Sequence, residues 1–328
     1  MSSTAPLPTI HVVIVNWNAG SLLAACLQSF DAVAADAVSL SRVTIVDNGS
    51  SDGSLRALDD LKVKLPLEII RNSDNRGFAA ACNQGARGSK AEFLLFLNPD
   101  TCLTAGSLEK PSLFLSDAQN AGVGIVGIQL IDQQGNVART CARRPSFWHM
   151  LGQSFGLDRC GIALFPTHFL KDWDHADTRT VDQVMGAFFF IRRSLFAKLD
   201  GFDERFFVYF EEVDLTVRAR DLGWTSVYLA TARAFHHGSG TTDQVKDLRL
   251  FYWWRSRILY AFKHFGILSA GTITLVTAAF EPIVRSLALL ANMRIGEIGM
   301  VWKAARLLWA NLSKMRQGET RSPAASEN

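Results

Sequence analysis

Short apolar runs alternate with amphipathic runs along the first half of the chain. Runs rich in Val, Ile, Leu and Phe predict β-strands over residues 10–15, 43–46, 67–71 and 93–97. The segments between them, residues 20–30, 54–61 and 78–88, have helical character. Strands that alternate with helices at this spacing predict an α/β fold built on a doubly wound, mostly parallel sheet.

The second half continues with less regular patterns. Apolar runs predict strands over residues 123–131 and 184–192, and residues 213–222 read as a helix that stops at Gly223. The segment 141–180 reads as irregular, which is typical of a binding loop or lid. Gly122 to Gly127 fit G-x-G-x-x-G, but they lie inside a strand and open no helix, so we exclude a dinucleotide site there.

Polar clusters fall where the predicted strands end. These clusters are Asn16–Asn18, Asp47–Asp52, Asn72–Gly77 and Asn98–Asp100. Each is also an ordinary turn sequence when taken alone. In a doubly wound sheet, however, ligands bind beyond the carboxyl ends of the strands. The shared position of all four clusters predicts one common pocket.

Three acids lie close together at the start of the predicted helix after an aromatic run. Glu211, Glu212 and Asp214 follow the residues from Phe206 to Phe210. Apolar surroundings and neighbouring negative charges raise the pKa of a carboxyl group, so this cluster can hold a proton-accepting base. The alternative is structural, because acids at a helix start offset the macrodipole and Asp214 can pair with Arg218.

Two further sites carry metal-binding chemistry. Asp100 ends a buried strand, and a carboxylate there can bind Mg²⁺ or Mn²⁺ through oxygen. His236 and His237 lie at a second strand-to-loop boundary, and imidazole is a further ligand for Mn²⁺. The alternatives are a proline turn at Pro99 and a structural histidine.

Composition narrows the class of protein. The 328 residues are 48% hydrophobic, which is enough for one large core or two smaller ones. The five cysteines show no CxxC spacing, so we expect reduced thiols in a cytosolic setting and no zinc site. Residues 1–8 are short and polar, and we expect no signal peptide.

The C-terminal fifth differs from the rest of the chain. Residues 246–316 contain eleven Lys and Arg against three acids, so this segment carries +8 and the rest −5. An uncharged run over 266–280 is shorter than the roughly 20 residues of a membrane span, and we expect Pro282 to break its continuation. The pattern favours helices in an anionic membrane interface, with packing on the catalytic domain or another subunit as the alternative. The tail 317–328 reads as disordered.

The motifs in order carry a family resemblance. They are Val12-Val13-Ile14-Val15-Asn16-Trp17-Asn18, Val46-Asp47-Asn48-Gly49-Ser50-Ser51-Asp52-Gly53, Asn75-Arg76-Gly77-Phe78-Ala79, Leu97-Asn98-Pro99-Asp100, and Gly201-Phe202-Asp203 through Asp214-Leu215. The chain resembles an inverting family 2 glycosyltransferase with the GT-A fold, in its rhamnosyltransferase-like branch. The resemblance covers residues 10 to about 240.

The resemblance implies a donor site and a metal site. The residues implied for nucleotide-sugar binding are Asn16, Asn18, Asp47, Asn48, Arg76, Gly77 and Asn98. Asp100 takes the last acidic place of the family's DxD motif, whereas Asn98 departs from the first and leaves one fewer charge. His236 matches the family's third metal position. The implied cofactor is a divalent cation, Mg²⁺ or Mn²⁺.

The resemblance also implies a catalytic base and an acceptor site. Glu212 matches the base, where the family more usually has Asp, and Glu211 is its neighbour. Phe210, Glu211 and Arg143 are candidates for acceptor binding. Which of the two glutamates is the base stays open.

The implied reaction moves a sugar, L-rhamnose from dTDP-rhamnose, onto a lipid-linked or cell-surface glycan, as in O-antigen synthesis. The alternatives are another donor, UDP-galactofuranose or UDP-GlcNAc, and a catalytically silent sugar-nucleotide-binding subunit. The implied domains are a catalytic domain over 1–243, with a nucleotide-sugar half 10–100 and an acceptor half 101–243, and a helical segment over 244–316.

An acceptor on a polyprenyl diphosphate would explain membrane attachment. We therefore expect a cytoplasmic protein held peripherally at the inner face of the cell membrane. Nucleic acid is not an expected partner, and a homo-oligomer stays open.

Overall fold

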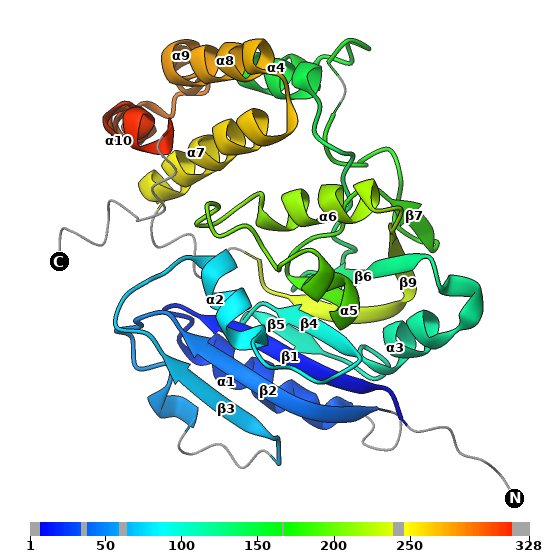
Figure 1. Ribbon diagram of the computed structural model, residues 1–328. Helices are drawn as coiled ribbons and strands as arrows, with labels where there is room; N and C mark the ends of the chain where they lie inside the picture. The colour runs from blue at the N-terminus through cyan, green and yellow to red at the C-terminus, as the bar shows by residue number, and fades with distance from the viewer. Residues whose placement is uncertain (1–6, 34–37, 59–63, 166, 239–245, 317–328) are drawn as a thin grey trace, which may run out of the picture.

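A nine-stranded sheet forms the centre of the protein (Figure 1). The computed structural model describes residues 7–33, 38–58, 64–165, 167–238 and 246–316. The strand order is β3-β2-β1-β4-β8-β6-β9-β5, and β7 pairs with β9. The strands are β1 (Thr9–Asn16), β2 (Ser39–Asp47), β3 (Leu67–Arg71), β4 (Phe93–Leu97), β5 (Thr101–Leu103), β6 (Val123–Ile131), β7 (Arg179–Val181), β8 (Phe188–Arg192) and β9 (Thr225–His236).

The predicted strands are present, and the sheet is mixed. Strands β3, β2, β1 and β4 are parallel neighbours, as the alternating pattern predicts. Strand β8 then runs antiparallel to both β4 and β6, while β6 and β9 are parallel. The start of β8 therefore lies at the same edge of the sheet as the end of β4, because Leu97 pairs with Phe188. This edge carries the candidate site.

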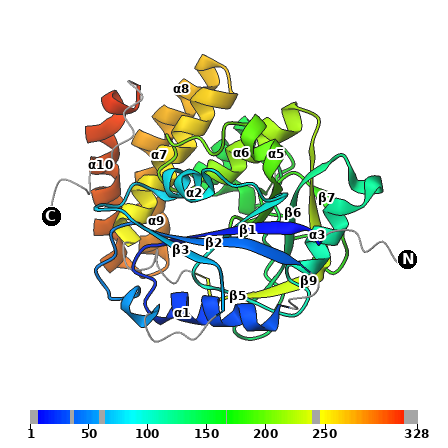
Figure 2. The ribbon, with the colours of Figure 1, turned by 60° about the horizontal axis from the view of Figure 1, so that its bottom comes forward.

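Helices cover both faces of the sheet (Figure 2). In β4, Phe93, Leu95 and Leu97 pack on one face, whereas Leu94 and Phe96 pack on the other, as expected for a strand buried on both sides. The first face is covered by α1 (Ser21–Gln28) and α3 (Glu109–Ser116), and the second by α2 (Phe78–Ala86), α5 (Arg193–Lys198) and α6 (Glu211–Asp221).

A further group of helices lies beyond α6, on the side away from the sheet (Figure 1). Its members are α4 (Phe147–Phe155), α7 (Lys246–His264), α8 (Ile267–Leu275), α9 (Glu281–Ala291) and α10 (Ile298–Arg316). Two small cores hold this group together, one between α7 and α10 and one between α4, α6, α7 and α8. Short 3₁₀ turns span Ser29–Ala32, Arg56–Leu58, Ala118–Asn120, Leu157–Arg159 and Ile295–Glu297.

Three local expectations are wrong. The segment 141–180 contains helix α4, which Ser146 caps by accepting a hydrogen bond from the backbone N–H of His149 at 3.2 Å. In the predicted helix 54–61, the described residues form only a 3₁₀ turn over Arg56–Leu58. The expected strand over residues 184–192 starts at Phe188 and not at Val184.

Pro282 also does not end the apolar helix. Residues Ile267–Ala291 form one 25-residue helical stretch, in which a π-turn (Val276–Phe280) precedes the proline. A π-turn shifts the hydrogen-bond register by one residue, so the chain can pass a residue that has no N–H to donate. The expected domain boundary at 243/244 and the tail 317–328 lie outside the described residues.

Candidate active site

The donor side of the candidate site begins at the ends of β1 and β2. Asn16 and Asp47 are register partners there, and both are buried. The Asn16 amide nitrogen donates to Asp47 Oδ1 at 2.7 Å, to Ser54 Oγ at 2.8 Å and to Ser50 Oγ at 3.0 Å. The Asn16 side-chain carbonyl oxygen is buried, and none of the described residues forms a hydrogen bond with it. A buried acceptor of this kind favours a ligand with an N–H group.

Asn18 and Asn48 shape the adjoining loops. Asn18 adopts a left-handed conformation with φ of 51°, and its Oδ1 accepts from the Ser51 backbone N–H at 2.8 Å. Asn48 is buried, and its amide donates to the Gly77 carbonyl at 3.1 Å. An open cavity of about 450 Å³ lies beside these loops and is lined by residues 50–56. The two asparagines therefore set the loop geometry and border an accessible space.

Gly77 joins the donor side to the acid turn. Its φ is +88°, and a Cβ at this position would lie 2.6 Å from the Phe207 carbonyl oxygen. The next residue, Phe78, donates its backbone N–H to that same oxygen at 2.6 Å. Only glycine fits this position. Arg76 precedes it, exposed at the N-terminus of α2, and within the described chain it forms no ion pair.

Asp100 and His236 lie together at the end of β4. Strand β5 pairs with the end of β9, so that Thr101 is the register partner of His236. Asp100 Oδ1 is 3.4 Å from His236 Nε2, and both side chains are at most 9% exposed. Asn98 donates its backbone N–H to the Ala187 carbonyl at 3.0 Å, which fixes this turn against the start of β8.

The pair Asp100 and His236 fits a divalent cation that a ligand helps to hold. Carboxylate oxygen and imidazole nitrogen are suitable donors for Mn²⁺, and diphosphate oxygens commonly complete such shells. Within the described ranges, no group of three or more His, Cys, Asp or Glu side chains gathers at one point. The protein itself therefore supplies a partial shell.

The acid pair lies at the first turn of α6, after an unusual backbone turn. Tyr209 and Phe210 both adopt left-handed conformations, with φ of 67° and 70°. Bulky residues rarely adopt this conformation, and strain of this kind clusters at functional sites. Glu211 is buried and Glu212 is half-buried, and the Oε2 atom of each is buried with no hydrogen-bond partner in the described part of the chain.

The electrostatic surroundings favour protonation of both glutamates. Burial, followed by the charge of Glu212, raises the pKa of Glu211 well above its ordinary value. Burial also raises the pKa of Glu212, against the opposing effect of backbone N–H groups at the helix start. Carboxyl groups in such an environment are suited to general acid–base chemistry.

The two glutamates have different neighbours. A Cβ at Gly186 would lie 3.8 Å from Glu212 Cδ, so Glu212 lies beside the segment that receives the Asn98 turn. Glu211 lies near Cys82 of α2, where its charge adds to the effect of burial in raising the pKa of that thiol. Glu212 is therefore the glutamate on the side of Asn98.

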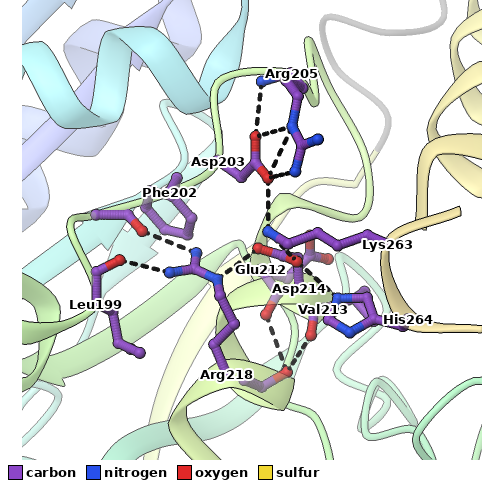
Figure 3. Close-up of polar contacts among 12 residues, drawn as sticks. Leu199, Phe202, Asp203, Arg205, Glu212, Val213, Asp214, Arg218, Lys263 and His264 are labelled. Carbon is purple, nitrogen blue, oxygen red and sulfur yellow. Dashed lines mark hydrogen bonds and ion pairs between the residues drawn. The ribbon is translucent and has the colours of Figure 1, made fainter. Parts of the chain in front are cut away.

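A buried network fixes the first turns of α6 to α7 (Figure 3). Asp214 is fully buried and contacts Arg218 at 2.7 Å, Lys263 at 2.7 Å and His264 at 2.8 Å. Lys263 also reaches Asp203 at 2.6 Å. The structure thus contains the expected ion pair between Asp214 and Arg218, and adds two groups from the C-terminal segment.

Sequence reasoning missed Lys263 and His264 as part of this region. They follow one another at the end of a helix 50 residues downstream of Asp214, and no local spacing indicates that they meet it. Phe210, a predicted acceptor-binding residue that precedes α6, lies against Tyr260 of α7, with ring centroids 5.4 Å apart. Arg143 instead pairs with exposed Asp172 at 3.2 Å, and its role stays a prediction.

The comparisons with known proteins decide the family. The model of "Glycosyl transferase family 2" matches residues 11–199, more than half of the chain. The chain belongs to glycosyl transferase family 2. This match includes the donor-side loops and the turn at Asn98 to Asp100, and it ends before the acid pair.

The names of two relatives of this family 2 chain refer to rhamnosyl transfer and to O-antigen synthesis. A Mycobacterium tuberculosis protein named "N-acetylglucosaminyl-diphospho-decaprenol L-rhamnosyltransferase" is 27% identical over 252 residues, covering 72% of this chain and 78% of that protein. The Myxococcus xanthus "O-antigen biosynthesis protein RfbC" is 30% identical over 219 residues, covering 64% of this chain and 16% of that protein.

Solved structures support the fold. A mannosyltransferase from Pyrobaculum calidifontis, in complex with GDP-Man and Mn²⁺, superposes with a TM-score of 0.53 at 14% identity, covering 93% of this chain and 91% of that chain. GalNAc-T7 with UDP, GalNAc and Mn²⁺ gives 0.54 at 15% identity, covering 88% and 59%. The α/β glycosyltransferase fold expected from the sequence is confirmed.

Proposed function

We propose that this family 2 glycosyltransferase transfers L-rhamnose from dTDP-rhamnose to a lipid-linked glycan acceptor with inversion of configuration. The observation that carries the proposal is the position of Glu212. It is a half-buried acid with a raised pKa, beside the segment that receives the Asn98 turn. The relative named as a rhamnosyltransferase supports the choice of sugar and acceptor class.

In this proposal Glu212 accepts the proton of the acceptor hydroxyl. The acceptor oxygen forms a bond to the anomeric carbon while the bond from that carbon to the diphosphate oxygen breaks on the opposite face. The configuration therefore inverts, and no covalent enzyme intermediate forms. Arg76 and the N-terminus of α2 stabilise the negative charge of the leaving diphosphate.

Two further assignments complete the donor site. The unpaired Asn16 carbonyl and Asp47 would accept from the imide N–H of a thymine or uracil base. Asp100 and His236 would hold a divalent cation, which when bound supplies positive charge to the diphosphate.

A thermal-shift panel tests the donor assignment. We expect dTDP-rhamnose and dTDP, each with Mn²⁺, to stabilise the protein more than UDP-galactofuranose or UDP-GlcNAc. A ligand at one hundred times its Kd adds about 2.7 kcal/mol of stability. An Asp100→Asn variant should lose the Mn²⁺-dependent part of the shift and keep its ligand-free melting temperature.

The outcomes of the panel separate the alternatives. A larger shift with a UDP-sugar would move the proposal to that donor. No shift with any nucleoside diphosphate would contradict the donor site. If dTDP-rhamnose binds but is neither slowly hydrolysed nor transferred, the protein is a catalytically silent subunit.

We also propose that α8 and α9 attach the protein to the inner face of the cell membrane. An 18-residue window of the stretch Ile267–Ala291 has a mean hydropathy of 1.6 and is 39% buried, and the stretch is long and apolar enough to cross a membrane by length and composition. Large apolar side chains on it and beyond it are exposed: Ile267, Leu268, Leu275, Phe280, Ile283, Leu287, Leu290, Met293 and Ile295. An apolar surface of this kind, in a basic segment, suits an anionic interface.

Vesicle co-sedimentation tests the membrane proposal. We expect the protein to bind vesicles that contain anionic lipids more strongly than zwitterionic vesicles. The double variant Leu268→Glu with Leu287→Glu should lose most of this binding, because both side chains are at least 60% exposed. The matched control is Leu113→Glu on α3, which is 53% exposed and should bind as the wild type does. Equal loss in both variants would contradict the proposal.

A further inference from the structure

Three polar side chains with unused hydrogen-bonding groups gather between α4 and α7. Arg257 lies on α7, His149 lies on α4, and His168 lies on the segment after α4. Arg257 and His149 are at least 95% buried. Among the described residues, no hydrogen-bond partner reaches Arg257 Nε and Nη1, the two ring nitrogens of His149 or His168 Nδ1.

Direct and electrostatic contacts connect these groups. The rings of His149 and His168 stack with centroids 4.7 Å apart. Burial, followed by the positive charges of His168 and Arg257, lowers the pKa of His149 to about 3. The ring of His149 is therefore neutral at pH 7, and its surroundings oppose a further positive charge. Buried polar groups without partners destabilise a fold, so several in one place point to a ligand.

The charge of the cluster selects an anion. The Arg257 guanidinium stacks over the Trp253 ring at 4.5 Å, and within the described ranges it donates hydrogen bonds only through Nη2, to Thr277 Oγ1 at 2.6 Å and to Glu281. Glu281 is shared with Arg285, whose Nε donates to it at 2.8 Å. Two guanidinium groups thus share one carboxylate, which leaves one excess positive charge. The free N–H groups of Arg257 match the oxygens of a phosphate.

The position of the cluster connects the acid pair to the apolar surface. Phe210, next to Glu211, packs on Tyr260, which lies one helical turn from Arg257. On the other side, Thr277 and Glu281 belong to the stretch that carries the exposed apolar side chains, with Phe280 48% exposed between them. His168 is only half-buried and is the member nearest to solvent.

We propose that Arg257, His149 and His168 bind the diphosphate group of the lipid-linked acceptor. This proposal rests on the proposed function, because it assigns a subsite to that acceptor. The acceptor sugar then points toward Glu212, the diphosphate lies in the cluster, and the lipid follows the apolar surface of α8 and α9. The negative charge of the diphosphate completes the charge balance around Arg257.

Two variants test the subsite by removing ring nitrogens. His149→Phe deletes both nitrogens of its ring and His168→Phe deletes Nδ1, and for these atoms the described residues offer no hydrogen-bond partner. If these groups bind no ligand, both variants keep or raise the melting temperature, and the binding of farnesyl diphosphate does not change. We expect each variant to weaken binding of farnesyl diphosphate about tenfold, measured by calorimetry on the full chain, while the melting temperature is kept.

Three probes separate the sources of the diphosphate. Inorganic pyrophosphate should show the same dependence on His149 and His168, and farnesol should show none. Binding of dTDP should be unchanged in both variants. The matched control is Tyr228→Phe, which removes a buried hydrogen bond to the His175 carbonyl at 3.2 Å, and should lower stability while keeping farnesyl diphosphate affinity.

The results also separate this subsite from the donor assignment. Unchanged farnesyl diphosphate affinity in both variants, with dTDP still bound, would overturn the subsite alone. A parallel loss of dTDP binding would assign the cluster to the donor and overturn the proposal. Wild-type binding of farnesyl diphosphate that depends on His149, without any nucleotide binding, would keep the subsite and overturn the donor site.

Discussion

Replacing Glu212 by glutamine is expected to lower kcat about a hundredfold or more and, at the same time, to raise thermal stability. The loss of activity follows because an amide cannot accept the proton of the acceptor hydroxyl. The gain in stability follows from the raised pKa. A carboxyl group whose folded-state pKa lies above its ordinary value of 4.5 opposes folding once it ionises.

The size of the stability gain in Glu212→Gln depends on pH. The destabilisation from Glu212 develops as the pH rises from about 4.5 through the folded-state pKa, and it is fully present at higher pH. The gain in stability of Glu212→Gln should therefore be absent below pH 4.5 and complete above the folded-state pKa of Glu212. Chemical unfolding at several pH values measures the gain, and the affinity for dTDP should not change.

Glu211→Gln is the matched control, because Glu211 shares the helix turn and also has a raised pKa. It should gain stability in the same way and keep most of its activity. If Glu211→Gln abolishes turnover and Glu212→Gln does not, Glu211 is the base and the contact between Glu212 and Gly186 has no catalytic meaning.

Asp214→Asn is expected to destabilise the protein by about 3–5 kcal/mol, because it removes the buried carboxylate that half-buried Arg218 and Lys263 share. Burial opposes ionisation of Asp214, but His264, Arg218 and Lys263 outweigh it and lower its pKa. A group with a lowered folded-state pKa stabilises the fold above its ordinary value of 3.8. This contribution is lost as the pH falls below 3.8 through the folded-state value.

Denaturant unfolding measures this effect, and α6 provides its own control. Arg220 on the same helix pairs with Asp182, but the two side chains are 57% and 34% exposed. Asp182→Asn should therefore cost at most about 1 kcal/mol. Equal losses in the two variants would show that burial of Asp214 does not set the strength of its network.

The sequence predicts the parts of the fold that depend on local pattern. Strands such as Phe93–Leu97 and Val123–Ile131 have the predicted bounds, because long apolar runs between turn residues leave little choice. Helix α4 was missed because its aromatic and histidine residues lack a clear period. The expectation that Pro282 ends the helix is wrong because a single π-turn, which no sequence pattern predicts, lets the helix continue.

The candidate site also contains residues that the sequence predicts and residues that it does not predict. The strand-end residues Asn16, Asp47 and Asp100 could be found because a parallel sheet brings strand ends to one edge. Lys263 and His264 could not, since their contacts with Asp214 depend on how α7 packs over α6. The partnerless atoms of Arg257 and His149 are likewise a property of packing, which spacing along the chain does not encode.

The lysine that bridges Asp203 and Asp214 has a consequence for the modularity of this enzyme. Because Lys263 belongs to α7, the C-terminal helices supply counter-charges to the interior of the catalytic domain and form one cooperative unit with it. The segment is therefore not a detachable anchor. A transfer of these C-terminal helices to another protein therefore has to include α6, α7 and the loop between Asp203 and Glu211 as a single block.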